Sequence, residues 1–323
     1  MTTTFDPIQL DLETIRSCRD SIKAHVLDLD GIYLPTLQEK VRTLATDINQ
    51  ADDQARSTLA LLPAALQVRA IQSTLNVLIK EAAQSGPVPP QHVAEVSSYL
   101  EDALNQTREH YNALSMRLDN LRAFDTGNIT DLQGSLNQQL EIQEAALNET
   151  EARRERYAEH KRTLNAAMSV IEDKNMIDRL IPLLDAFKEF DPKTPQASLV
   201  RAAVVSVQNI LRMASESVKY VDLVEARANV QAELNSITEQ LGDIRPRIKS
   251  LQQRLQQLST AQTLEQNVTR YEEQVRKICT ALLTFIDAQP APSSVSIVED
   301  VEAFIANAKA LSDNVSDLRA RWK

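Results

Sequence analysis

The side chains that most often perform chemistry in proteins are few in this sequence, and their spacing matches no familiar catalytic motif. The four histidines are His25, His92, His110 and His160, and none has a glutamate three residues before it. The Glu-x-x-His pair of helical di-iron sites is therefore missing. The P-loop, Gly-x-Ser-x-Gly and His-Glu-x-x-His motifs are missing too. Because His25 sits near an apolar helical face, we expect it to be a structural histidine of a bundle.

Carboxylates and thiols give no better catalytic candidates. The adjacent acids Asp52–Asp53 and Glu272–Glu273 would point about 100° apart on a helix. We therefore expect both pairs to be solvated surface groups. Cys18 and Cys279 are far apart, form no Cys-x-x-Cys pair and lie on or beside apolar helical faces, so we expect inert packing. The sequence thus predicts a protein that is not an enzyme, with no cofactor, metal or small-molecule substrate.

Composition excludes further classes. The 323 residues carry a net charge of −10, which disfavours a nucleic-acid binder because such proteins need a basic face. Only 5 glycines are present, which disfavours sandwiches, barrels and doubly wound sheets. The start of the chain lacks the basic and apolar regions of a signal peptide. No apolar run reaches the length of about 18 residues that indicates a transmembrane helix. We therefore expect a protein that is made in soluble form.

Helical periodicity extends over nearly the whole chain and is interrupted at a few breaks. Asp30-Gly31, the Pro-rich stretch 85–90, residues 125–128 and 191–195, and the Pro-rich stretch 289–294 are the breaks. Pro63 is expected to kink or interrupt a long helix. Thr130 is a candidate cap for the helix after 128. Thr194 and Pro195 fit an N-cap followed by proline at the first helical position.

The most regular stretch runs from Val230 to Leu258, where apolar residues alternate spacings of three and four. That spacing is typical of a coiled-coil seam. It predicts an antiparallel hairpin of two long helices, one over residues 130–190 and one from Pro195 to about Leu258, with its tip near residue 192. The seam positions are Leu234, Ile237, Leu241, Ile244, Ile248, Leu251 and Leu255.

The predicted fold is therefore all-α: an elongated rod of long antiparallel helices with a helical bundle at one end, a two-helix coiled-coil stalk and an amphipathic hairpin tip. Residues 1–128 plus 260–323 would form the bundle. Residues 129–175 plus 217–259 would form the stalk. Residues 176–216 would form the tip.

The tip is unusually apolar for the end of a rod. From Ala197 to Ala214 the only charged residues are Arg201 and Arg212, and valines form a stripe on the other side. Two interpretations stay open. Either these residues pack against each other as a small helical head, or they form a concealed membrane-active hairpin. In a ring of such hairpins the polar stripes can face a water-filled lumen, which avoids their cost in lipid. Pro182 counts against a regular span in the first arm.

At this point the sequence resembles the α-helical pore-forming toxins, and most closely the smaller B components of the alpha-xenorhabdolysin binary cytotoxins. The long antiparallel stalk, the weakly charged tip and the stretch Ser217-Val-Lys-Tyr-Val-Asp-Leu-Val-Glu-Ala-Arg227 carry this resemblance. The resemblance implies a soluble monomer that is released from a bacterium without a cleavable signal peptide. This monomer would assemble with an A component into a hetero-oligomeric ring on a target-cell membrane, insert its tip and lyse the cell.

On this chain the resemblance implies insertion of residues 176–216. The lumen-facing candidates are Arg201, Gln208 and Arg212. The lipid-facing candidates are Val200, Val204, Val207, Leu211, Leu180, Leu184 and Phe187.

Two other interpretations are weighed against this one. A structural or scaffolding coiled-coil protein would have no activity on lipid and would bind a partner along the seam. A membrane-curving helical dimer would need a basic concave face, which the net charge of −10 disfavours. A plain rod has no reason to carry a nearly uncharged amphipathic tip, which favours the toxin interpretation.

Overall fold

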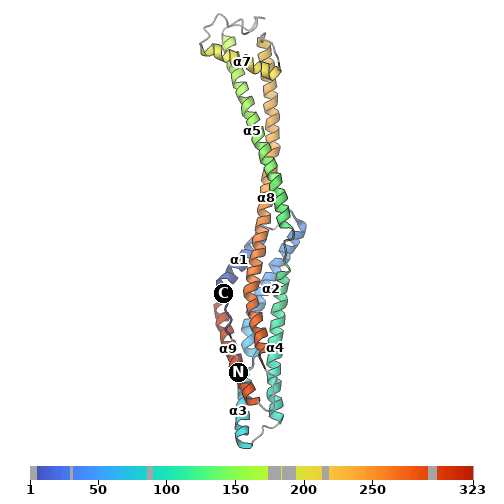
Figure 1. Ribbon diagram of the computed structural model, residues 1–323, viewed down its shortest axis with the longest axis vertical. Coiled ribbons are helices and arrows are strands. Elements are labelled where there is room, and N and C mark those ends of the chain that lie inside the picture. The colour runs from blue at the N-terminus through green and yellow to red at the C-terminus, as the bar shows by residue number, and fades with distance from the viewer. Residues whose placement is uncertain are drawn as a thin grey trace. The chain divides into compact units, whose positions relative to one another are not determined.

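The computed structural model describes residues 6–29, 32–85, 90–173, 183, 194–212, 218–289 and 297–322. Every regular element in these ranges is an α-helix, which confirms the predicted all-α class (Figure 1). The helices are α1 (Leu12–Asp28), α2 (Pro35–Ala65), α3 (Val68–Ser85), α4 (Pro90–Arg122), α5 (Ile129–Asp173), α7 (Pro195–Leu211), α8 (Tyr220–Asp287) and α9 (Ile297–Arg321).

The chain divides into two compact units. The first unit comprises Met1–Ile129 and Gln256–Lys323, and the second comprises Thr130–Leu255. Helix α8 contributes its N-terminal part to the second unit and its C-terminal part to the first. The finer division into bundle, stalk and tip at 128, 175, 217 and 260 stays a prediction.

In the first unit, α2 packs against α1, α4 and α9, and α3 packs against α4 and α9. Each helix buries the residues that recur every three or four positions, as an amphipathic helix must. Pro63 does not interrupt α2, which continues to Ala65. The interruption falls at Gln67, whose positive φ of 47° turns the chain before α3 begins.

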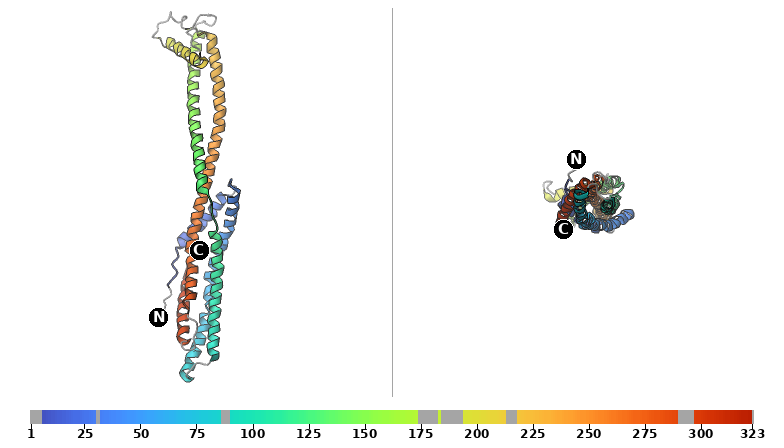
Figure 2. Two further views of the ribbon diagram at one scale, coloured as in Figure 1. Left: turned by 45° about the vertical axis from the view of Figure 1, so that its right-hand side comes forward. Right: turned by 90° about the horizontal axis from the view of Figure 1, so that it is seen from below.

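In the second unit, α5 and the N-terminal part of α8 run antiparallel and side by side (Figures 1 and 2). Two ion pairs join them: Arg245 to Glu151 at 2.8 Å, and Arg153 to Glu233 at 3.6 Å. The predicted seam residues lie on the packed face of α8. Ile237, Leu241, Ile248 and Leu251 are buried, and Leu234, Ile244 and Leu255 are half-buried.

The two ends of α7 are fixed by local chemistry. Thr194 is the N-cap, and its hydroxyl accepts a hydrogen bond from the Ala197 amide at 3.4 Å, with Pro195 in the first turn. This confirms the predicted cap. Arg212 adopts the left-handed conformation (φ 53°), which ends the helix.

Two boundaries differ from the predicted ones. No single helix runs from Pro195 to Leu258, because the left-handed Arg212 separates α7 from α8 and the long return arm begins at Tyr220. Thr130 does not cap α5, since that helix begins one residue earlier, at Ile129. The predicted tip near residue 192 lies outside the described residues.

Candidate functional site

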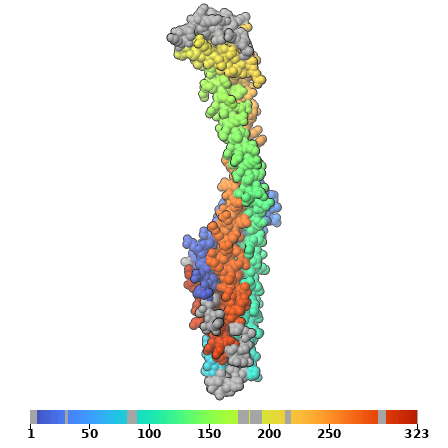
Figure 3. Space-filling model, viewed as in Figure 1, coloured from blue at the N-terminus to red at the C-terminus, as the bar shows by residue number. Residues whose placement is uncertain are grey.

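Helix α7 packs its apolar stripe against the ends of α5 and α8 within the second unit (Figure 3). Val200, Val204 and Val207 are exposed by 1%, 3% and 0% respectively. Their cluster includes four buried residues of α5 and three of α8. These are Leu164, Ala167, Met168 and Ile171 on α5, and Leu223, Ala226 and Val230 on α8.

The three predicted lipid-facing valines therefore face protein in this state. Leu211 packs half-buried against the same cluster. Leu180, Leu184 and Phe187 lie outside the described residues. Leu184 is a predicted lipid-facing residue, whereas its neighbour Leu183 was not predicted to have a role and is 3% exposed in the cluster. The Leu183 amide donates to the Val218 carbonyl at 2.8 Å, a contact between distant segments that no spacing rule predicts.

The opposite face of α7 carries the predicted lumen-facing residues. Arg201 and Arg212 are exposed, and Gln208 is half-buried. Val205 is an apolar residue on this outer side and is 55% exposed. Other helices therefore pack against the apolar side of α7, whereas most of its polar side is exposed.

A polar contact between two described side chains also lies at this interface. The His160 Nδ1 of α5 lies 3.2 Å from the Ser206 Oγ of α7, and Ser206 is 7% exposed. The ring of Tyr157 meets the ring of His160 edge to face, with centroids 6.3 Å apart. No role for His160 or Ser206 could be predicted from the sequence, because only the packing of α7 on α5 brings the two side chains together.

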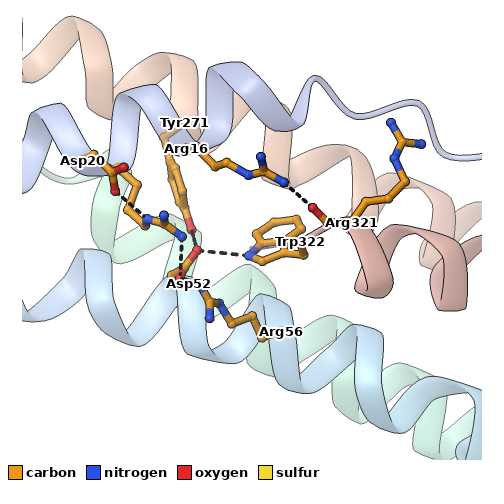
Figure 4. A network of polar contacts seen from close by, with 8 residues as sticks. Arg16, Asp20, Asp52, Arg56, Tyr271, Arg321 and Trp322 are labelled. Carbon is orange, nitrogen blue, oxygen red and sulfur yellow. Dashed lines mark hydrogen bonds and ion pairs between the residues drawn. The ribbon is translucent and has the colours of Figure 1, made fainter.

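The first unit contains a buried polar network centred on Asp52 of α2 (Figure 4). The Asp52 carboxylate accepts from the Tyr271 hydroxyl and the Trp322 indole, both at 3.3 Å. It also pairs with Arg56 at 3.0 Å and with Arg19 at 3.4 Å. Burial and the adjacent Asp52 charge raise the pKa of Tyr271, so this hydroxyl stays protonated and donates.

The prediction that both acid pairs are solvated is wrong for one member of each. Asp52 is 4% exposed and Glu272 is 7% exposed, whereas Asp53 and Glu273 are exposed. Glu272 bonds Arg276 one turn away, and Arg276 also pairs with Asp119 at 2.8 Å. Buried carboxylates persist where cations or donors compensate them. Arg56 and Arg276 lie one turn from Asp52 and Glu272, whereas Arg19, Tyr271 and Trp322 reach Asp52 from distant parts of the sequence.

The two thiols are buried, as expected. Burial raises the pKa of Cys279 to about 12 and also raises that of Cys18. His25 lies half-buried on α1, with Nδ1 3.5 Å from an Asp28 carboxylate oxygen. Among the residues that the structure describes, no cluster of His, Cys, Asp and Glu could hold a metal ion.

The search for membrane spans was limited to the described parts of the chain. There, no helix combines the length and the apolar character that a membrane crossing requires.

The fold defined by these features is an all-α fold in which a short amphipathic helix packs onto the end of a two-helix coiled coil. No protein-family model matches the chain, and no curated protein matches it. Solved structures do. The chain is similar to PaxB from Photorhabdus luminescens, with a TM-score of 0.78, 17% identity and 97% coverage of both chains.

It is also similar to XaxB from Xenorhabdus nematophila, with a TM-score of 0.71, 14% identity and coverage of 97% of this chain and 98% of that one. A chain of the XaxAB pore complex from Xenorhabdus nematophila matches with the same TM-score and coverage, at 15% identity. PaxB and XaxB are B components of alpha-xenorhabdolysin binary pore-forming toxins, the family that the sequence resembles. The chain has their fold.

Proposed function

We propose that this chain is the B component of a two-component α-helical pore-forming cytotoxin. The observation that carries the proposal is the match of 97% of the chain to the fold of PaxB and of a chain of the XaxAB pore complex. The chain would be released as a monomer and would assemble with an A component into a hetero-oligomeric ring on a target-cell membrane. It would act by lysis and not as an enzyme.

The packing of α7 supports this proposal. Val200, Val204 and Val207 contact other apolar side chains in the present state. Lipid tails are about as apolar as leucine, so these valines would lose little on exchanging protein neighbours for lipid. The energetic obstacle is the polar side of the helix, because charge in the hydrocarbon region costs several kcal/mol unless it reaches water.

A ring removes that obstacle. We propose that residues 176–216 insert, with Val200, Val204, Val207 and Leu211 toward lipid. Leu180, Leu184 and Phe187 would join them from the preceding segment. Arg201, Gln208 and Arg212 would then face a water-filled lumen. The long helices α5 and α8 would supply the stalk and the contact with the A component.

A reversible cross-link between α5 and α7 tests the insertion step. The His160 and Ser206 side chains meet at 3.2 Å, so H160C/S206C places two thiols at the α5–α7 interface. They can be closed directly or with a short reducible linker. The native thiols are buried with raised pKa values and should not compete. We expect the closed form, mixed with the A component, to release no dye from liposomes, and a reductant to restore release.

The single variants H160C and S206C, treated with the same oxidant or linker, are the matched controls and should release dye throughout. Full release from the closed double variant would contradict insertion of α7. No release from the unmodified chain with the A component, while the chain stays helical, would favour the structural-rod interpretation.

Deletion of residues 190–212 should abolish lysis and leave the protein soluble, and retained lysis would overturn the assignment of the inserting segment.

A further inference from the structure

A groove of about 370 Å³ lies between α5 and α8, within the second unit. Two of the side chains that line it are apolar: Leu251 of the predicted seam is 8% exposed, and Ile142 of α5 is 58% exposed. Burial of apolar surface stabilises a fold, so Ile142, most of whose surface stays in water, contributes little to the isolated chain. Single exposed apolar residues are common on proteins, so a binding site here requires a second property.

The second property is a local excess of positive charge. Between residues 243 and 254, α8 carries four basic side chains and one acidic one, although the whole chain has a net charge of −10. One of the four, Arg245, pairs with Glu151 of α5 at 2.8 Å. Arg247 is exposed at the groove, and no residue that the structure describes pairs with it. Arg254 also lines the groove, so basic side chains border its apolar lining.

The spacing of these two arginines indicates what the groove can accept. Arg247 and Arg254 are seven residues apart, which on an α-helix is about two turns and roughly 10 Å. A third helix that packs along a two-helix coiled coil repeats its contacts at the same interval of seven residues. Acidic side chains at that interval on such a helix would meet the two arginines, and an apolar residue between them would cover Ile142 and Leu251.

We propose that this groove binds a helix of the A component, and that this helix carries two acidic residues in heptad spacing with an apolar residue between them. A guanidinium at the border of the groove offers paired donors to a carboxylate. The amide side chains of Gln139 and Gln143, which also line the groove, supply further donors and acceptors to polar groups of the partner. The apolar contact provides affinity, and the arginines select an acidic partner and fix its register.

This inference rests on the proposed function, in which the A component lies beside this chain in the ring. It narrows the contact with the A component from two long helices to one groove of the second unit. None of the groove residues belongs to α7 or to the apolar cluster that holds α7. Variants of the groove should therefore weaken assembly without changing how α7 is packed.

Titration of the full chain against a fixed amount of the purified A component tests the groove. The mixture contains vesicles of phosphatidylcholine and cholesterol, and the readouts are co-flotation of the two proteins and dye release. Arg247→Glu places a like charge opposite the partner's acid and should raise the chain concentration for half-maximal co-flotation roughly tenfold. Ile142→Gln removes the apolar contact and should raise this concentration by a similar factor of roughly ten.

Two matched controls alter exposed side chains of α5 that do not line the groove. Arg154→Glu changes the net charge by the same amount as Arg247→Glu, and Leu132→Gln replaces an apolar residue that is 39% exposed. Both controls should assemble like wild type. All four variants change exposed residues and should keep the helix content of wild type by circular dichroism. The two groove variants test the charged and the apolar part independently, so one decides if the other unfolds.

A lysine scan of the acidic residues of the A component sharpens the test. At least one substitution should restore assembly with the Arg247→Glu chain and weaken assembly with wild type. Restoration by none of them would overturn the proposal.

Wild-type assembly by both groove variants, with dye release retained, would overturn this inference and leave the proposed function standing. No dye release by the wild-type chain with the A component would overturn the proposed function itself. Equal weakening by the groove variants and their controls would show a general effect of charge or polarity and would contradict the inference. Self-association of the chain alone that Ile142→Gln abolishes would assign the groove to a second copy, which would also contradict it.

Discussion

The two units bury polar groups in different ways. In the first unit, Asp52 joins Arg19 of α1, Tyr271 of α8 and Trp322 beyond α9 to α2 through directional, partly charged bonds. In the second unit, α7 is attached by an apolar cluster and by a contact between the His160 and Ser206 side chains. A buried charge needs its own partners, whereas an apolar face accepts any apolar neighbour.

This difference assigns opposite roles to the two regions. The Asp52 network cannot be rebuilt in lipid, so it suits a unit that keeps its structure. The α7 interface can exchange protein for lipid at little cost, so it suits a segment that leaves. Substitutions in the first unit should therefore lower its stability strongly, whereas substitutions in α7 should mainly change how readily this helix detaches.

The largest effect should come from Asp52→Ala. This substitution leaves Arg19, whose side chain is 12% exposed, without its buried counter-ion. It also leaves the Tyr271 hydroxyl without the carboxylate to which it donates. We expect a loss of about 3 kcal/mol in the free energy of unfolding, since removing one partner of a buried pair is strongly destabilising. Trp322 is the only tryptophan, so its fluorescence during urea unfolding reports on this unit.

Asp53→Ala is the control for this measurement, because the neighbouring carboxylate is exposed. Its effect should stay within about 0.5 kcal/mol. An equal loss in both variants would show that Asp52 does not hold the helices together.

A second comparison uses adjacent valines of α7. Val204 is 3% exposed and Val205 is 55% exposed. Val204→Ala removes buried methyl groups and should lower the free energy of local opening of α7 by about 1–2 kcal/mol. Hydrogen exchange of the α7 amides measures this free energy. Val205→Ala should leave the exchange rates nearly unchanged. Equal effects at both positions would mean that α7 is not packed through the valine stripe.

A smaller effect is expected from the polar contact. Ser206→Ala removes one hydrogen-bond partner of His160 and should lower the free energy of local opening of α7 by about 1 kcal/mol. A double-mutant cycle with His160→Ala isolates the pairwise part, again read from exchange in α7. Additive effects of the two substitutions would show that the contact contributes no coupling. A loss of first-unit stability would contradict the separation of the two regions.

The smallest effect concerns the thiols. Burial raises the pKa of Cys279 to about 12, so its reactive thiolate is far scarcer near neutral pH than that of a free cysteine. Because the folded pKa lies above the unfolded value of 9.0, this group's contribution to stability is complete below about pH 9 and is lost as the pH rises toward 12. We expect no alkylation of the native chain and labelling of both cysteines after unfolding. Rapid native labelling would show that the first unit opens readily.

The spacing of residues predicted much of the fold. Four residues of the predicted seam, Ile237, Leu241, Ile248 and Leu251, are buried on α8, and Thr194 caps α7. These features are local or periodic, so a short window of sequence contains their cause. The end of α7 at Arg212 could not be predicted, because the left-handed conformation there is adopted by an arginine and not by the glycine that usually marks it.

The candidate site was predictable only in part. The valine stripe and the basic side of α7 follow from the order of its residues, so both could be predicted. The packing of the stripe on α5 and α8, the contact of Ser206 with His160, and the burial of Asp52 but not of Asp53 are visible only in the folded chain. Periodicity specifies which face of a helix is apolar. The partner that covers that face, and any buried charge within it, depend on contacts between residues far apart in the chain.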